Sequence, residues 1–192
     1  MSTQTLAPAA TPASEAAEAL TSESSLTVTE LPAGRGLYGV VADDAALAQL
    51  GLSDSAEHAL IYLDRTEQDT LDYNARRHFQ SGRTDSSQLR RNLAALLWDE
   101  LELNAAPASP GLRTQYLPLT SDSEETLTRW MREHLRFTVW QPAGESDPIA
   151  GVEQEVLASE APALNLDGVD EPWEHLAEKV DAMRTSGRSA TL

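Results

Sequence analysis

Two short apolar segments, each containing one tyrosine, place the tightest limit on how this chain can fold. Residues 37–41 are apolar, end in two valines and follow a glycine, and residues 59–63 form a second run of the same kind. Apolar runs of this length predict buried β-strands. Between them Asp43 and Asp44 precede a short helical pattern over residues 45–50, because acidic residues favour helix N-termini. Two strands joined by a small helical insert predict an antiparallel pair.

The remainder of the chain alternates helical patterns with one further strand. A helix capped by Ser86 or Ser87 is expected because a serine hydroxyl can accept from the first free backbone amides. The predicted elements are helices over residues 70–79, 88–98, 122–135 and 149–159 and a strand over residues 136–141. The sequence therefore predicts an α/β fold, with a small three-stranded, mostly antiparallel sheet flanked by helices.

Both ends of the chain are expected to lie outside this domain. Residues 1–32 are rich in Ala, Ser, Thr and Pro, carry four acids and no base, and lack an aromatic residue. Such a segment buries too little apolar surface to offset the entropy lost on ordering. We therefore predict a disordered acidic tail over residues 1–32, the folded domain over residues 33–168, and a C-terminal tail over residues 169–192 with a possible helix at 172–183.

Composition narrows the class of protein. The chain has no cysteine, so it has neither a disulfide framework nor a thiolate metal site. Its N-terminal sequence lacks the basic start and apolar run of a secretory signal, and no apolar stretch approaches the roughly 20 residues of a membrane helix. These features predict a cytoplasmic protein that does not enter a membrane.

Charge is unevenly distributed. The chain has 14 basic and 31 acidic residues, a net charge of −17, which argues against loose charge-driven binding of nucleic acid. Residues 65–91 nevertheless hold six arginines against four acids. This window could contact DNA, although a charge cluster is more often a solvated helix face.

Several short strings occur in the order and spacing of one known family. The strings are Gly36-Leu37-Tyr38, Ile61-Tyr62-Leu63-Asp64, His78-Phe79, Gln88-Leu89-Arg90-Arg91-Asn92, Val152-Glu153 and Leu164-Asn165. Over about residues 35–165 the chain resembles the GIY-YIG nuclease superfamily. The resemblance implies a metal-dependent endonuclease that hydrolyses DNA phosphodiester bonds.

The resemblance also implies roles for individual side chains. Tyr38 matches the tyrosine that helps to deprotonate the attacking water, and Tyr62 matches the tyrosine near the scissile phosphate. Glu153 matches the ligand of one Mg²⁺ or Mn²⁺ ion, and Asn165 matches the residue that orders the site. Taken singly, the tyrosines could equally be core residues, Glu153 an exposed helix acid and Asn165 a turn residue.

The chain departs from the family at two positions. Asp64 stands where the family has glycine, and adds bulk and negative charge near an anionic substrate. Asn74 stands where the family has an arginine, so the catalytic arginine is expected to be Arg65 or Arg76. The expected DNA-contacting residues are Arg77, Arg83, Arg90 and Arg91.

These departures leave two functions open. One is the active endonuclease, with DNA as its substrate. The other is a catalytically degenerate domain that binds DNA or protein, with the acidic tails as interaction arms. No histidine is assigned to a metal, and His78 is expected to face solvent at the end of its helix.

Overall fold

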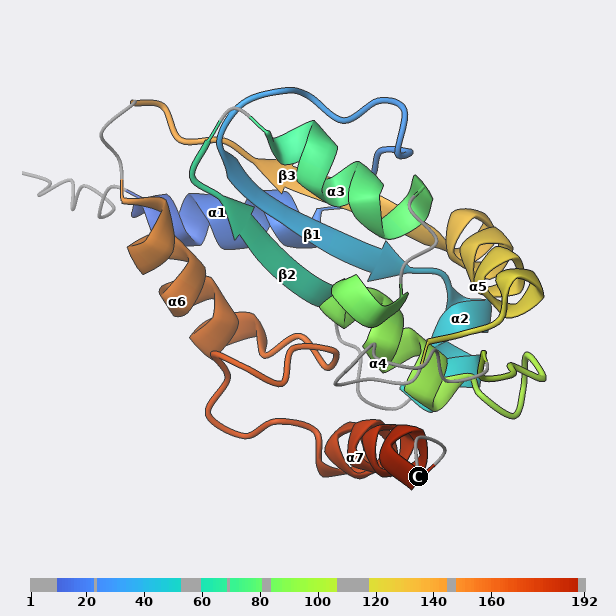
Figure 1. The fold of residues 1–192 in the computed structure, drawn as a ribbon. Coiled ribbons are helices and arrows are strands. Elements are labelled where there is room, and N and C mark those ends of the chain that lie inside the picture. The colour runs from blue at the N-terminus through green and yellow to red at the C-terminus, as the bar shows by residue number, and fades with distance from the viewer. Residues whose placement is uncertain are drawn as a thin grey trace, which may run out of the picture.

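A three-stranded antiparallel sheet forms the centre of the molecule (Figure 1). The computed structural model describes residues 10–22, 24–52, 60–68, 70–80, 84–106, 118–144 and 148–189. Strand β1 (Gly36–Ala42) lies between β2 (Leu60–Thr66) and β3 (Leu135–Trp140), and both pairings are antiparallel. The predicted α/β fold with a small three-stranded sheet is confirmed.

Five predicted helices are present close to their predicted positions. They are α2 (Asp44–Leu50), α3 (Leu71–Gln80), α4 (Gln88–Leu96), α5 (Ser121–His134) and α6 (Ile149–Glu160). Local capping explains where two of them begin. The side chain of Asp43 accepts from the backbone N–H of Ala46 at 2.8 Å, and that of Ser87 accepts from the N–H of Arg90 at 3.1 Å. Each bond satisfies an amide that has no partner within its helix.

The sheet is covered on both faces, because its side chains alternate between two apolar clusters. Tyr38 and Phe137 point toward α3, α4 and α5, whereas Leu37 and Leu63 point toward α6 and an N-terminal helix. In Figure 1, α3 lies in front of the sheet and this N-terminal helix, α1, lies behind it. The sheet is therefore the middle layer of three, and the site described below lies on the α3 side.

A register shift between β1 and β2 brings the residues of the site onto one face. The regular pairing breaks between Val40 and Val41, which oppose Tyr62 and Leu60, so Ile61 is an extra residue in β2. Beyond this bulge Asp64 stands opposite Tyr38. A bulge turns the following side chains by one position relative to an unbroken ladder. Tyr38, Tyr62 and Asp64 consequently share the face covered by α3.

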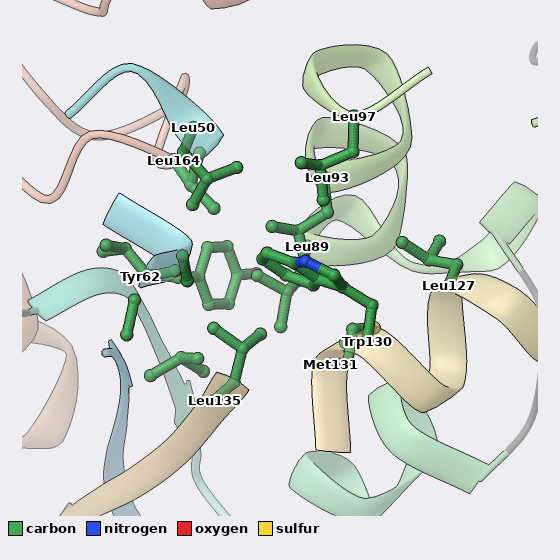
Figure 2. Close-up of a cluster of buried hydrophobic side chains, with 14 of the residues drawn as sticks. Leu50, Tyr62, Leu89, Leu93, Leu97, Leu127, Trp130, Met131, Leu135 and Leu164 are labelled. Carbon is green, nitrogen blue, oxygen red and sulfur yellow. The ribbon is translucent and has the colours of Figure 1, made fainter. Parts of the chain in front are cut away.

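The apolar cluster on this face surrounds the ring of Tyr62. Figure 2 shows this ring between Leu164 on one side and Leu89 of α4 on the other, with Leu135 of β3 below it. The ring is only 2% exposed. Its position is therefore set by core packing, which leaves only the hydroxyl to take part in chemistry.

Part of the segment that was predicted as a disordered tail forms a packed helix in the described residues. Helix α1 (Pro12–Thr21) begins at a capping box formed by Thr11 and Ser14, and its Ala16 and Leu20 are completely buried against α6 and the sheet. The hydroxyl of Thr138 in β3 donates to the carbonyl of Leu20 at 2.8 Å. The composition of residues 1–32 hid this helix because its buried face consists of alanines and one leucine. Residues 1–9 of the predicted tail lie outside the described part.

The C-terminal segment is also part of the domain. Helix α7 (Glu174–Ser189) contains the predicted helix, and it packs beside α4 with Leu176 and Met183 buried in the main cluster. Helices α1 and α7 thus pack against the domain that was predicted over residues 33–168. No helix in the described ranges is long and apolar enough to cross a membrane.

Candidate active site

A pocket of about 360 Å³ opens between the sheet, α3 and the start of α4. Its walls are mostly polar, although it lies directly above the apolar core. It is lined by Tyr38, Tyr62, Asp64, Asn74, Arg77, His78, Ser86, Ser87, Gln88 and Arg91. Two of the predicted catalytic residues and two of the predicted DNA-contacting arginines thus meet in one place.

Both predicted tyrosines direct their hydroxyls to the carboxylate of Asp64. The Tyr38 O–H donates to Asp64 Oδ2 at 2.9 Å, and the Tyr62 O–H approaches the same oxygen at 3.4 Å. Burial, with the nearby Asp64 charge adding to it, holds the pKa of both phenols well above the usual value of 10.0. Asp64 was expected only as a negative charge that hinders the substrate, but the structure makes it the common acceptor of the two phenols.

His78 also contacts Tyr38, which the sequence did not predict. Its Nε2 lies 2.9 Å from the Tyr38 hydroxyl, and its Nδ1 lies 2.6 Å from Ser87 Oγ. The ring is 9% exposed, so the expectation of a solvent-facing histidine was wrong. Burial lowers the pKa of His78 to about 4, while the Asp64 charge partly opposes this shift. The imidazole is therefore neutral at physiological pH.

Glu153 lies outside the pocket but near enough for its charge to help raise the pKa of Tyr62. It belongs to α6, which packs on the opposite face of the sheet, and it does not line the pocket. Its carboxylate forms an ion pair with Arg65 of β2. Arg65 stands opposite Leu37 of β1, and Leu37 points to the α6 face of the sheet. Arg65 also pairs with Glu67 at 3.3 Å. The sequence predicted a single pocket shared by Tyr38, Tyr62 and Glu153, and the described pocket is lined by the two tyrosines without Glu153.

The surroundings of Glu153 bear directly on the metal site implied by the resemblance. Burial raises the pKa of Glu153 above its usual value of 4.5, and Arg65 only partly offsets this effect. The carboxylate thus faces a guanidinium, and no group of three or more His, Cys, Asp or Glu side chains that could hold a metal occurs among the described residues. An ion held by Glu153 would have to compete with the Arg65 guanidinium and take its other ligands from water and phosphate.

Asn165 has a structural role at the open edge of the sheet. Its Oδ1 accepts from the backbone N–H of Leu63 and its Nδ2 donates to the carbonyl of Leu63, both at 2.9 Å. The side-chain amide therefore continues the hydrogen-bond ladder of β2 at Leu63, the residue before Asp64. These two bonds hold the backbone of β2 at the residue that precedes Asp64.

The structure separates the predicted arginines into different groups. Arg77 and Arg91 line the pocket, whereas Arg76 pairs with Asp72 at 3.6 Å and is not among the lining residues. Arg90 is fully buried and forms an ion pair with Glu124 at 2.6 Å, so its predicted contact with DNA is wrong. Arg65 points to Glu153 instead of the pocket, and Arg83 lies outside the described residues.

Sequence reasoning missed Ser87 and His78 as parts of the site and assigned Arg77 only to DNA contact. One signal was available: His78 lies four residues after Asn74 on α3, so both occupy one side of that helix. No local pattern indicated which of the adjacent Arg76 and Arg77 faces the sheet.

Comparison with known proteins identifies the family. The sequence pattern of the GIY-YIG catalytic domain matches residues 42–186, about three quarters of the chain. Tyr62, Glu153 and Asn165 lie within the match, and Tyr38 precedes it by a few residues. No match was found among curated proteins or among solved structures. Because the match covers well over half of its length, the chain belongs to the GIY-YIG catalytic domain family.

Proposed function

We propose that this protein is an endonuclease that hydrolyses phosphodiester bonds of DNA in the pocket beneath α3. The observation that carries the proposal is the meeting of two phenols and two arginines in one polar pocket. Family membership supports the reaction class, since the domain is a nuclease domain. The pocket supports the substrate class, because it combines hydroxyl donors with the cationic groups that bind phosphate.

Arg77 and Arg91 are the cationic groups placed to hold the scissile phosphate. They reach the pocket from α3 and α4. A guanidinium binds two phosphate oxygens at once and stays charged at any physiological pH. Arginine can also stabilise the charge that develops on these oxygens during attack, a contribution of about 3 kcal/mol for one well-placed donor. Arg77 thus takes the role for which the sequence suggested Arg65 or Arg76.

The metal requirement is part of the proposal and rests on the family, with Mg²⁺ or Mn²⁺ as the expected ion. Such an ion would neutralise charge on the phosphate and on the leaving oxygen. Glu153 remains the expected ligand from the resemblance. Its pairing with Arg65 means that a cation competes with this guanidinium for the carboxylate.

Plasmid nicking with Mg²⁺ or Mn²⁺ tests the proposal, and two adjacent arginines provide a matched pair of variants. Arg77→Ala should slow cleavage by about 100-fold or more, because it removes a cationic donor from the pocket. Arg76→Ala removes the same charge from the same helix outside the pocket and should change the rate by less than about threefold. Equal losses in both variants would show that net charge, not the pocket, determines activity.

Glu153→Ala serves as the second arm of this assay. Cleavage that survives Glu153→Ala but is abolished by EDTA would place the metal elsewhere. If the wild-type protein cleaves no DNA form with either metal, the endonuclease proposal is rejected.

One observation favours the second candidate, a degenerate domain that binds DNA without cleaving it. The Arg65–Glu153 ion pair occupies the carboxylate that the family uses for metal, and Asn74 replaces the family arginine at the pocket. Fluorescence anisotropy with labelled duplex and single-stranded DNA in EDTA separates the two candidates. Binding that weakens in Arg77→Ala and Arg91→Ala, without cleavage under any condition, would establish the binding module.

A further inference from the structure

The side chain of Asp64 accepts three hydrogen bonds and still has room for another donor. It accepts from the Tyr38 and Tyr62 hydroxyls through Oδ2 and from the backbone N–H of Arg65 through Oδ1 at 2.8 Å. A carboxylate offers about four acceptor positions. Three are taken here, and the position that remains is on Oδ1. Asp64 also lines the pocket, so a polar group bound there can reach it.

The direction of the hydrogen bonds around Tyr38 follows from this acceptor. The single hydroxyl proton of Tyr38 is donated to Asp64, so His78 Nε2 must donate to the Tyr38 oxygen. A neutral imidazole with its proton on Nε2 accepts at Nδ1, and Ser87 Oγ donates to it at 2.6 Å. Ser87 in turn accepts from the Arg90 N–H. The donors therefore run in one direction, from Ser87 through His78 and Tyr38 to Asp64.

We propose that Asp64 is the proton acceptor of this site and that Tyr38 stays protonated as a donor. The inference rests on the proposed function and specifies its chemistry. A water held at Oδ1 of Asp64 attacks phosphorus, its proton passes to Asp64 as the new P–O bond forms, and the bond to the leaving oxygen breaks. The leaving oxygen takes a proton from solvent, and Asp64 releases its own proton to solvent afterwards. No oxidant or additional reactant is required.

Two features of the site oppose a tyrosinate as the base. Loss of the Tyr38 proton would place a second negative charge within 2.9 Å of Asp64, in a ring that is 1% exposed. Burial and this carboxylate both raise the pKa of Tyr38, as noted above. Asp64, which stands where the family has glycine, is therefore the proposed proton acceptor in this chain.

Single-turnover DNA cleavage by Asp64 variants tests the assignment. Asp64→Asn keeps the size and should slow cleavage by about 100-fold or more, because general-base catalysis contributes at least that much. Asp64→Glu should retain more activity than Asp64→Asn. Asp72→Asn is the matched control, since Asp72 is an acid on α3 paired with Arg76 outside the pocket, and it should cleave at the wild-type rate. Wild-type rates in Asp64→Asn would overturn the proposal.

Two further measurements separate this proposal from the endonuclease proposal itself. Binding of labelled DNA in EDTA should be as tight or tighter in Asp64→Asn, since the variant removes a negative charge from the pocket. Nitrogen NMR of His78 should show the proton on Nε2 in the wild type and its redistribution toward Nδ1 in Asp64→Gly, where Tyr38 can donate to the imidazole. A proton on Nδ1 in the wild type would overturn the acceptor role. If the wild-type protein never cleaves DNA, the endonuclease proposal fails and the base role fails with it, while the NMR result still decides the hydrogen-bond direction.

Discussion

Replacing Arg90 by alanine distinguishes a DNA-contacting arginine from a buried structural one. The guanidinium of Arg90 is completely buried, donates from Nη1 to the His78 carbonyl at 2.9 Å and pairs through Nη2 with Glu124 at 2.6 Å. Glu124 also accepts from the backbone N–H and hydroxyl of Thr84 at 2.9 and 3.0 Å. Arg90 thus joins α4, the end of α3 and α5 through groups that have little access to water.

The size of the effect follows from what the substitution leaves behind. Removing one partner of a buried ion pair costs about 3–5 kcal/mol, because the other charge remains buried. Glu124 retains its bonds to Thr84 and its side chain is 15% exposed, so the lower value, about 3 kcal/mol, is expected. Against a total stability of about 5–15 kcal/mol this is a large loss. It corresponds to a fall in Tm of about 6–12 °C for a domain of this size.

Urea unfolding and thermal melting of Arg90→Ala and Arg91→Ala provide the assay. Arg91 is the next residue on α4 and lines the pocket, so its substitution should change stability by less than about 1 kcal/mol and weaken DNA binding. Arg90→Met with Glu124→Leu removes both charges and should recover part of the stability lost in Arg90→Ala. Wild-type stability together with weakened DNA binding in Arg90→Ala would refute the structural role.

Three further predictions concern the candidate site. Glu153→Gln should leave the free energy of unfolding at neutral pH unchanged or slightly higher, within about 1 kcal/mol. The reason is that burial raises the pKa of Glu153 despite the Arg65 charge, so the charged form is costly to bury. A loss of several kcal/mol in urea unfolding would refute this. Lowering the pH from 6.5 toward 4 should cost up to about 3 kcal/mol through His78, because the unfolded chain takes up a proton near pH 6.5 that the folded ring binds only near pH 4. Stability that falls equally in His78→Gln over this range would assign the effect to other groups. Asn165→Ala should cost about 1–3 kcal/mol and speed hydrogen exchange of the Leu63 amide, since that buried amide loses its acceptor; an unchanged exchange rate would contradict the ladder contact.

The strands and most of the helices could be predicted because their signals are local. The apolar run around Tyr38 fixes β1, and the serine at position 87 fixes the start of α4 through a bond to an amide three residues later. Helix α1 escaped prediction because its buried face is small and gains its stability from α6 and Thr138, which are distant in sequence. In such a helix tertiary packing outweighs intrinsic propensity.

The sequence identified those site residues whose role depends on the side chain alone and not on a partner from another element. The two tyrosines were recognised and share a pocket, but the partners of Glu153 and Arg90 depend on which helix faces which side of the sheet. Adjacent arginines on one helix point about 100° apart, so a shift of one residue exchanges a pocket residue for a solvated one. The sequence alone cannot fix that rotation, since the helix is anchored by side chains from other elements.

The sequence by itself determined the order and type of the central elements and the presence of two tyrosines on neighbouring strands. The tertiary structure decided that the bulge in β2 places Asp64 opposite Tyr38, and that Glu153 pairs with Arg65 outside the pocket. The physical reason is the range of the interactions. Periodicity and caps act over a few residues, whereas strand register and the face that a helix covers are set by packing between segments up to about a hundred residues apart.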